Sequence, residues 1–254
     1  DRHLFATFRV QHRWDLCGSI KSQKTGRHLH RFIKSRPFGQ KKDELKELIE
    51  HSEDSGNGIL FDEAYELFHT PPVSSLEYVK DINNSNIFVC GAATKGLQAP
   101  GIRIGWVVAA KKYIEILGNF SSFGMGGVSR PSQLYALKLF DKNRIELSRS
   151  SVPHFYDEQR EKYGKSFSEI GLELFSGDGG FYHWCKLQNG LTAEELNEKL
   201  FKKGAAILKG TDCDMHRQGD NSHLKYFFRF SFGPLLPDSF HTDIKILSES
   251  INFN

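Results

Sequence analysis

The sequence lacks the features of several large classes of protein. None of its 254 residues belongs to an apolar run of the roughly 18 residues that a membrane-spanning helix requires. The chain does not open with a basic segment followed by an apolar stretch, so it shows no secretory signal. We therefore expect a cytoplasmic protein that makes no use of a membrane.

Cysteine is scarce and scattered, which argues against a disulfide framework and against a zinc site. The chain has four cysteines, and no two of them are spaced as C-x-x-C: Cys17, Cys90, Cys185 and Cys213. This pattern favours free thiols in a reducing compartment. His28 and His30 have a spacing that some metal ligands show, but no acidic or thiol side chain stands close to them, so we expect no metal.

The composition is that of a folded globular protein. Hydrophobic residues make up 39% of the chain and charged residues 26%, which excludes a disordered or fibrous class. Phenylalanine is used 21 times, so the chain has ample apolar bulk for a core. We treat His154, His183 and His223 as ordinary packed or surface residues.

Positive charge is concentrated at the start of the chain. Residues 1–42 contain eleven Lys and Arg and two Asp, a net charge of +9, whereas the remaining residues carry a net charge of −6. A basic arm of this kind can bind nucleic acid. No nucleic-acid recognition motif accompanies it, so we interpret residues 1–35 as a basic lead-in and do not expect a nucleic-acid partner.

Hydrophobic periodicity predicts alternating helices and strands. The predicted strands are Gly58–Phe61, Ile87–Cys90, Ile104–Ala109, Phe181–Leu187 and Tyr226–Phe232. Helices are predicted over 43–52, 111–118, 131–149, 154–170 and 193–203, and after Pro237. Thr192 and Glu195 form a capping box at the start of the helix over 193–203.

The order of these elements predicts an α/β fold class with two domains. The strands at 87–90 and 104–109 lack polar alternation, as strands covered on both faces do. We therefore expect a large domain with a mainly parallel sheet over 36–150. A smaller α+β domain is expected over 151–254.

Three short motifs follow one another at the ends of the predicted strands. They are Asp62-Glu63-Ala64-Tyr65, Ala92-Ala93-Thr94-Lys95 and Pro100-Gly101-Ile102-Arg103-Ile104-Gly105. In open α/β sheets the ligand lies at the carboxyl ends of the strands. A carboxylate, a phenol, an amine and a guanidinium at that edge match the needs of pyridoxal phosphate, whose aldehyde forms a Schiff base with lysine.

These motifs resemble those of the class I/II aminotransferases, a fold-type-I family of pyridoxal-phosphate enzymes. The family has Asp-x-x-Tyr, then Ser-x-Ser-Lys, then an arginine eight residues beyond the lysine, which is the distance from Lys95 to Arg103 here. The resemblance implies that Asp62 pairs with the pyridine nitrogen and Tyr65 with the ring oxygen. It also implies that Lys95 forms the Schiff base, and that Thr94 and Arg103 hold the phosphate. Ala92 lacks the hydroxyl of the first Ser.

The resemblance extends along most of the chain. Ser129–Gln133 is similar to the helix start of the family, and Gly179–Tyr182 to the opening of its small domain. Phe228–Phe232 resembles the strand whose arginine, here Arg229, grips the α-carboxylate of the substrate. Ser35–Gln40 stands where the family has Asn-Pro-x-Gly, with Arg36 in place of the Asn.

The resemblance implies an aminotransferase that moves an amino group from an amino acid to a 2-oxo acid through a Schiff base on Lys95, in a homodimer. A pyridoxal-phosphate lyase on the same scaffold stays open, because the motifs bind the cofactor and the carboxylate rather than the side chain. A non-catalytic or fragmentary scaffold, used for dimerisation or protein interaction, also stays open. Family members carry a further N-terminal portion that residues 1–35 do not resemble.

Overall fold

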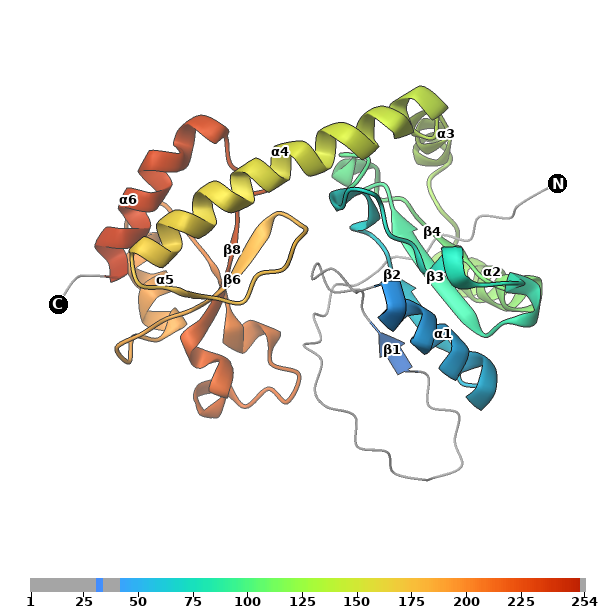
Figure 1. The fold of residues 1–254 in the computed structure, drawn as a ribbon, viewed down its shortest axis with the longest axis horizontal. Coiled ribbons are helices and arrows are strands. Elements are labelled where there is room, and N and C mark those ends of the chain that lie inside the picture. The colour runs from blue at the N-terminus through green and yellow to red at the C-terminus, as the bar shows by residue number, and fades with distance from the viewer. Residues whose placement is uncertain (1–30, 34–41, 252–254) are drawn as a thin grey trace. The chain divides into compact units, whose positions relative to one another are not determined.

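The computed structural model describes residues 31–33 and 42–251, which form two compact units (Figure 1). In the sequence the units meet between Pro153 and His154, within one continuous helix. Most of the predicted lead-in lies outside the described residues, as do the Ser35–Gln40 motif with Arg36 and the His28–His30 pair. Among the described helices, none is both long enough and apolar enough to cross a bilayer.

The first unit contains a four-stranded sheet with the order β1-β2-β3-β4. Its strands are β1 (Arg31–Ile33), β2 (Ile59–Asp62), β3 (Ile87–Ala92) and β4 (Gly105–Val108). The first three are parallel and β4 runs antiparallel to β3, so the predicted mainly parallel sheet is confirmed. The expectation that the β4 segment is covered on both faces is wrong, because no residue of β4 is fully buried and Val108 is 37% exposed.

Helix α1 (Lys42–Ser55) covers one face of this sheet (Figure 1). Alternate residues of β2 and β3 point to that face and are buried, as strand geometry requires. They pack against Leu45 and Ile49, which lie four residues apart on one side of α1. The resulting core is Leu45, Ile49, Ile59, Phe61, Ile87 and Val89.

Three helices follow β4: α2 (Lys111–Met125), α3 (Arg130–Leu139) and α4 (Lys142–Glu169). The prediction of separate helices over 131–149 and 154–170 is wrong in two places. A new helix begins at Lys142, because the Asp141 carboxylate accepts hydrogen bonds from the N–H groups of Asn143 (3.0 Å) and Arg144 (3.3 Å). Helix α4 then continues through Pro153, whose ring is fully buried, and this burial offsets the missing backbone hydrogen bond.

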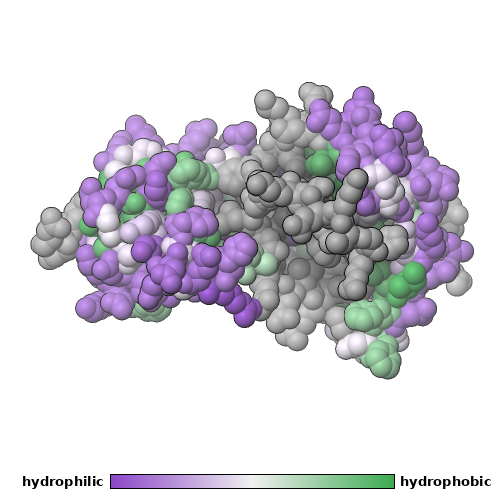
Figure 2. Space-filling view, turned by 90° about the horizontal axis from the view of Figure 1, so that it is seen from below, coloured by the Kyte–Doolittle hydropathy of each residue, from purple (hydrophilic) through white to green (hydrophobic). Residues whose placement is uncertain are grey.

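Helix α2 presents an apolar side to its surroundings. Ile116, Phe120 and Phe123 are 63%, 66% and 94% exposed, and they recur at helical spacing along one face. Figure 2 shows hydrophobic side chains gathered among hydrophilic ones at the end where Figure 1 places α2. Exposed apolar surface of this kind is typical of a contact region for another protein surface.

The second unit contains an antiparallel sheet with the order β5-β6-β8-β7. Its strands are β5 (Glu173–Leu174), β6 (Tyr182–Lys186), β7 (Leu208–Lys209) and β8 (Phe227–Ser231). The later part of α4 joins helices α5 (Ala193–Phe201) and α6 (Phe240–Ile251) in this unit. Tyr163 of α4 is buried, and its ring centre lies 5.3 Å from that of Phe230 on β8, so an aromatic core joins helix to sheet.

The predicted capping box at the start of α5 is confirmed. The Thr192 hydroxyl accepts a hydrogen bond from the N–H of Glu195, and the Glu195 carboxylate accepts one from the N–H of Thr192. We expect Thr192→Ala to lower the free energy of unfolding by about 1 kcal/mol, because a donor at the helix start then loses its partner. Urea unfolding measures this loss. Thr242→Ala, at an exposed position of α6, is the control, and an equal loss in both variants would contradict the prediction.

Candidate active site

The three motifs lie at one end of the sheet in the first unit. Asp62 is the last residue of β2 and pairs in register with Cys90 of β3. Ala92 ends β3 and pairs with Gly105, the first residue of β4. Since β2 and β3 are parallel and β4 is antiparallel, the segments that carry Asp62, Lys95 and Arg103 all lie at this end of the sheet. In α/β proteins the ligand binds at the end of the sheet where the parallel strands finish.

The segment after β2 carries Asp62 and Tyr65, both half-buried. The Asp62 carboxylate accepts a hydrogen bond from the N–H of Ala64 (3.3 Å), which turns the chain back at the strand end. Tyr65 directly precedes a short 3-10 helix and lies against Phe68, with ring centres 5.3 Å apart. Backbone turn and ring contact together hold the carboxylate and the phenol close to the sheet.

The segment after β3 is a tight turn that contains Thr94 and Lys95, again half-buried. The Lys95 carbonyl accepts hydrogen bonds from the backbone N–H of Gln98 (3.0 Å) and from its side-chain amide (2.6 Å). At Gly96 any Cβ would lie 2.8 Å from the Leu67 side chain, so the turn packs directly on the preceding segment. The backbone of the lysine is therefore fixed on both sides.

Arg103 adopts a left-handed backbone, with φ 55° and ψ 48°. This conformation is unfavourable for a residue with a Cβ, and residues held in it concentrate at functional sites. The Arg103 guanidinium is exposed and donates a hydrogen bond to the Pro100 carbonyl (2.9 Å). Of the two motif glycines, only Gly105 is required by packing, since its Cβ would lie 3.0 Å from the Gly91 carbonyl while Gly101 faces open space.

A buried carboxylate beside Asp62 is a feature that the sequence analysis missed. Glu63 is 6% exposed and accepts hydrogen bonds from the Ser74 hydroxyl (2.7 Å) and the N–H of Ser75 (2.6 Å). Burial, together with the negative charges of Asp62 and Glu63, raises the pKa of Cys90 to about 12. Cys90 is therefore protonated at neutral pH and acts as a packing residue.

Glu63 and Glu66 line a small cavity of about 60 Å³ behind the lysine turn. Burial, together with the negative charge of Glu63, raises the pKa of Glu66 to about 7, although the charge of Arg149 opposes the shift. Glu66 therefore exchanges a proton near neutral pH. The sequence shows that Glu66 directly follows the first motif, but only the fold shows that Arg149 lies near it. The walls are completed by Ala64, Leu67, Ala92, Gly96, Leu97, Trp106, Phe140 and Ile145.

Arg229 belongs to the second unit, where it lies in the middle of the sheet. On β8 it pairs in register with Trp184 of β6 on one side and with Leu208 of β7 on the other. Its guanidinium carbon lies 5.3 Å from the centre of the Tyr182 ring, a cation–π distance. The neighbouring Phe228 points to the opposite face and is fully buried.

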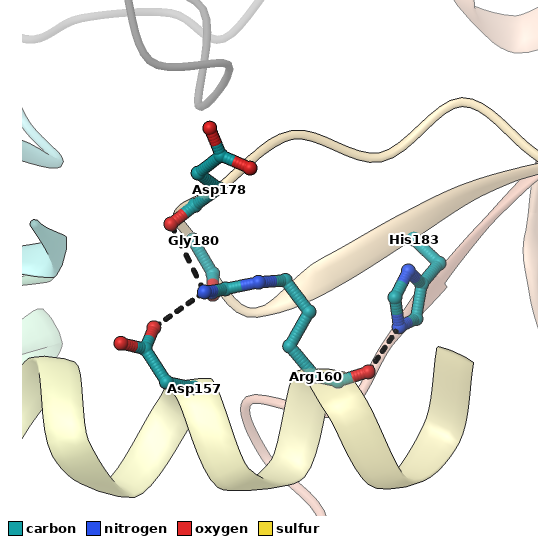
Figure 3. A network of polar contacts seen from close by, with 5 residues as sticks. All are labelled: Asp157, Arg160, Asp178, Gly180 and His183. Atoms are coloured by element: carbon teal, nitrogen blue, oxygen red, sulfur yellow. Dashed lines mark hydrogen bonds and ion pairs between the residues drawn. The ribbon is translucent and has the colours of Figure 1, made fainter. Parts of the chain in front are cut away.

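A polar network in the second unit fixes the turn that opens β6 (Figure 3). Arg160 of α4 is paired with Asp157 and donates hydrogen bonds to the carbonyls of Asp178 (2.9 Å) and Gly180 (3.3 Å). The ring of His183 is 2% exposed, and its Nε2–H donates to the Arg160 carbonyl (2.9 Å). His183 is thus a packed residue, and it ties β6 to α4.

Most of the chain matches one known protein family. The sequence profile of aminotransferase class I and II matches residues 40–239. The chain belongs to the class I and II aminotransferases. It is 26% identical over 158 residues to aromatic-amino-acid aminotransferase 1 of Thermococcus litoralis, covering 61% of this chain and 37% of that relative.

Two further aminotransferases show how far the similarity extends. The probable aspartate/prephenate aminotransferase of Aquifex aeolicus is 25% identical over 147 residues, 55% of this chain and 36% of the relative. The solved α-aminoadipate aminotransferase of Thermus thermophilus has a TM-score of 0.72 at 18% identity, over 82% of this chain and 54% of that one. This likeness confirms the predicted fold type. The chain spans less than two-fifths of the curated relatives it matches here.

Proposed function

We propose that the protein is a pyridoxal-phosphate-dependent aminotransferase, with Lys95 as the residue that bonds to the cofactor. The observation that carries the proposal is the convergence of Asp62, Lys95 and Arg103 at one edge of the first sheet. Membership of the class I and II aminotransferases supports the same activity. The proposed substrates are an amino acid and a 2-oxo acid.

The donor set at this edge fits pyridoxal phosphate. An amine (Lys95), a carboxylate (Asp62), a phenol (Tyr65), a hydroxyl (Thr94) and a guanidinium (Arg103) match its aldehyde, ring nitrogen, ring oxygen and phosphate. When bound, the cofactor supplies an electron sink for the bond to the substrate Cα.

Three side chains have separate proposed roles in the reaction. Asp62 holds a proton on the ring nitrogen, where a carboxylate is the natural partner of a positive charge. The Lys95 amine removes the proton from the substrate Cα as a general base, and later returns a proton. Arg229 binds the α-carboxylate through a charge-assisted, bidentate contact, which orients the substrate.

We propose a homodimer as the assembly. The exposed apolar residues Ile116, Phe120 and Phe123 on α2 support a protein contact on the first unit. Measuring the mass of the chain in solution by light scattering tests this part of the proposal, and a monomer at all concentrations would contradict it.

Lys95→Ala tests the function. With added pyridoxal phosphate, the unchanged chain is expected to show a visible absorption band that borohydride bleaches, and Lys95→Ala is expected to lose the band. The control is Lys80→Ala, which removes an exposed lysine of the same unit and should retain the band. A band of equal strength in the Lys95→Ala variant would contradict the assignment. A folded chain without any band would favour a non-catalytic scaffold.

A further inference from the structure

The half-exposed face of the second sheet carries a row of aromatic rings around Arg229. Residues that pair across antiparallel strands point to the same face, so Trp184 and Leu208 flank Arg229 directly. Tyr182 lies two residues before Trp184 on β6, and Phe227 two residues before Arg229 on β8, so both share this face. All five side chains are half-buried.

Ring contacts hold the members of this row in place. The rings of Trp184 and Phe227 are stacked, with centres 6.0 Å apart and planes inclined by 19°. Phe175, 41% exposed, extends the row with its ring centre 5.6 Å from that of Phe227. Rigid aromatic side chains lose little conformational entropy when a ligand packs on them.

The charges on this face favour a ligand with one carboxylate. Arg229, over the Tyr182 ring, supplies a guanidinium that matches a carboxylate. Lys186 lies further along the same face, but its ammonium is 3.1 Å from the Glu173 carboxylate. A second carboxylate on the ligand would have to compete with Glu173 for Lys186, and would otherwise meet aromatic rings.

We propose that the amino-acid substrates have aromatic side chains, and that Trp184 and Phe227 select them. This inference rests on the proposed function, because it takes Arg229 as the group that binds the α-carboxylate. A phenyl ring that packs against the row loses its contact with water, which favours binding of an aromatic ligand over an aliphatic dicarboxylate.

The test measures binding to the full chain without cofactor. The two probes are 3-phenylpropanoate, which has the carboxylate and ring of an aromatic amino acid, and succinate, an aliphatic dicarboxylate. Isothermal titration calorimetry is expected to show that 3-phenylpropanoate binds about tenfold more tightly than succinate. Equal binding of the two probes, or tighter binding of succinate, would overturn the inference.

Variants separate the role of the rings from that of the guanidinium. Arg229→Gln is expected to weaken both probes, whereas Trp184→Ala is expected to weaken 3-phenylpropanoate about tenfold and leave succinate unchanged. Trp184→Phe should keep the preference, and Phe201→Ala, which removes an aromatic 65% exposed on α5, should change nothing. If Trp184→Ala does not fold by circular dichroism, Phe227→Leu replaces it. A variant of the row that weakens both probes equally would contradict the assignment.

The two proposals fail separately. The Lys95 band is the visible absorption band that the unchanged chain is expected to show with pyridoxal phosphate and that Lys95→Ala is expected to lose. If this band is absent but the chain prefers 3-phenylpropanoate, the proposed function is wrong. The face around Arg229 then stands as a binding site for aromatic carboxylates. If the Lys95 band is present and the two probes bind equally, the proposed function stands and the aromatic selection is wrong. Spectral titration of the cofactor-loaded chain with L-phenylalanine and L-aspartate then gives an independent comparison.

Discussion

The free energy of unfolding is expected to fall by about 3 kcal/mol as the pH is lowered from 6.5 to about 4, because His183 is buried in its neutral form. Burial is the main cause that lowers the pKa of His183 to about 4; the hydrogen bond to the Arg160 carbonyl opposes this shift, and the nearby Arg160 charge adds to it. Between pH 6.5 and about 4, His183 is therefore protonated in the unfolded chain and neutral in the folded chain. The stabilisation is complete above pH 6.5 and is lost as the pH falls toward 4.

The hydrogen bonds of His183 show why protonation is disfavoured. Since a carbonyl only accepts, Nε2 carries the proton toward Arg160, and Nδ1 accepts from the Ser176 hydroxyl. A charged ring would force that hydroxyl to turn around, beside the Arg160–Asp157 pair. Gly164 lets the ring pack closely on α4, because a Cβ at this position would lie 3.2 Å from the ring.

Urea unfolding at a series of pH values measures this effect. His183→Gln, whose amide does not titrate, is expected to flatten the pH dependence between 6.5 and 4. His154→Gln is the control, since the His154 side chain is 77% exposed at the start of the same unit. A His183→Gln variant with the same slope as the unchanged chain would show that other groups cause the acid sensitivity.

Gly91→Ala is expected to destabilise the first unit by about 3 kcal/mol, at the upper end of overpacking effects. Gly91 of β3 pairs with Trp106 of β4, whose indole crosses over it. A Cβ at Gly91 would lie 2.4 Å from two atoms of that indole. The indole is also packed against Phe140 in an edge-to-face contact, with ring centres 4.9 Å apart, and this contact restricts its movement.

Gly101→Ala provides the matched control. Its Cβ would meet no atom within 4 Å, so we expect a change in unfolding free energy within about 0.5 kcal/mol. Both variants are compared by urea unfolding followed through tryptophan fluorescence. Gly91→Ala should also weaken the Lys95 band, because β3 leads directly into the lysine turn. Equal stability of the two variants would show that Trp106 relaxes at little cost.

The parts of the fold that could be predicted are those that depend on local sequence. Thr192 and Glu195 lie three residues apart and bond to each other, and the apolar residues of β2 and β3 lie in short, clearly bounded runs. The parts that could not be predicted depend on tertiary contacts. Pro153 continues α4 because its ring is buried, and β4 is half-exposed because of its place in the sheet.

The same distinction applies to the candidate site. The sequence alone was enough to find that Arg103 stands eight residues beyond Lys95, and that Asp62 and Lys95 follow the ends of strands. The environment of Glu66 could not, because Arg149 approaches it from a helix more than 80 residues later in the chain. The contact between the Arg160 carbonyl and His183 could not be predicted either. A helix carbonyl and a strand histidine are both common features, and nothing in the sequence indicates that these two meet.

Because Arg103 has a left-handed backbone, directed evolution of this chain for thermal stability and for cofactor binding is expected to favour different residues at position 103. Glycine adopts such a backbone without steric cost, so a library screened for thermal resistance alone would enrich Gly at this position. Under the proposed function, the same library screened for cofactor retention would keep Arg, because a guanidinium can donate two parallel hydrogen bonds to the phosphate. The residue recovered at position 103 would therefore show whether the screen had selected for thermal resistance or for cofactor retention.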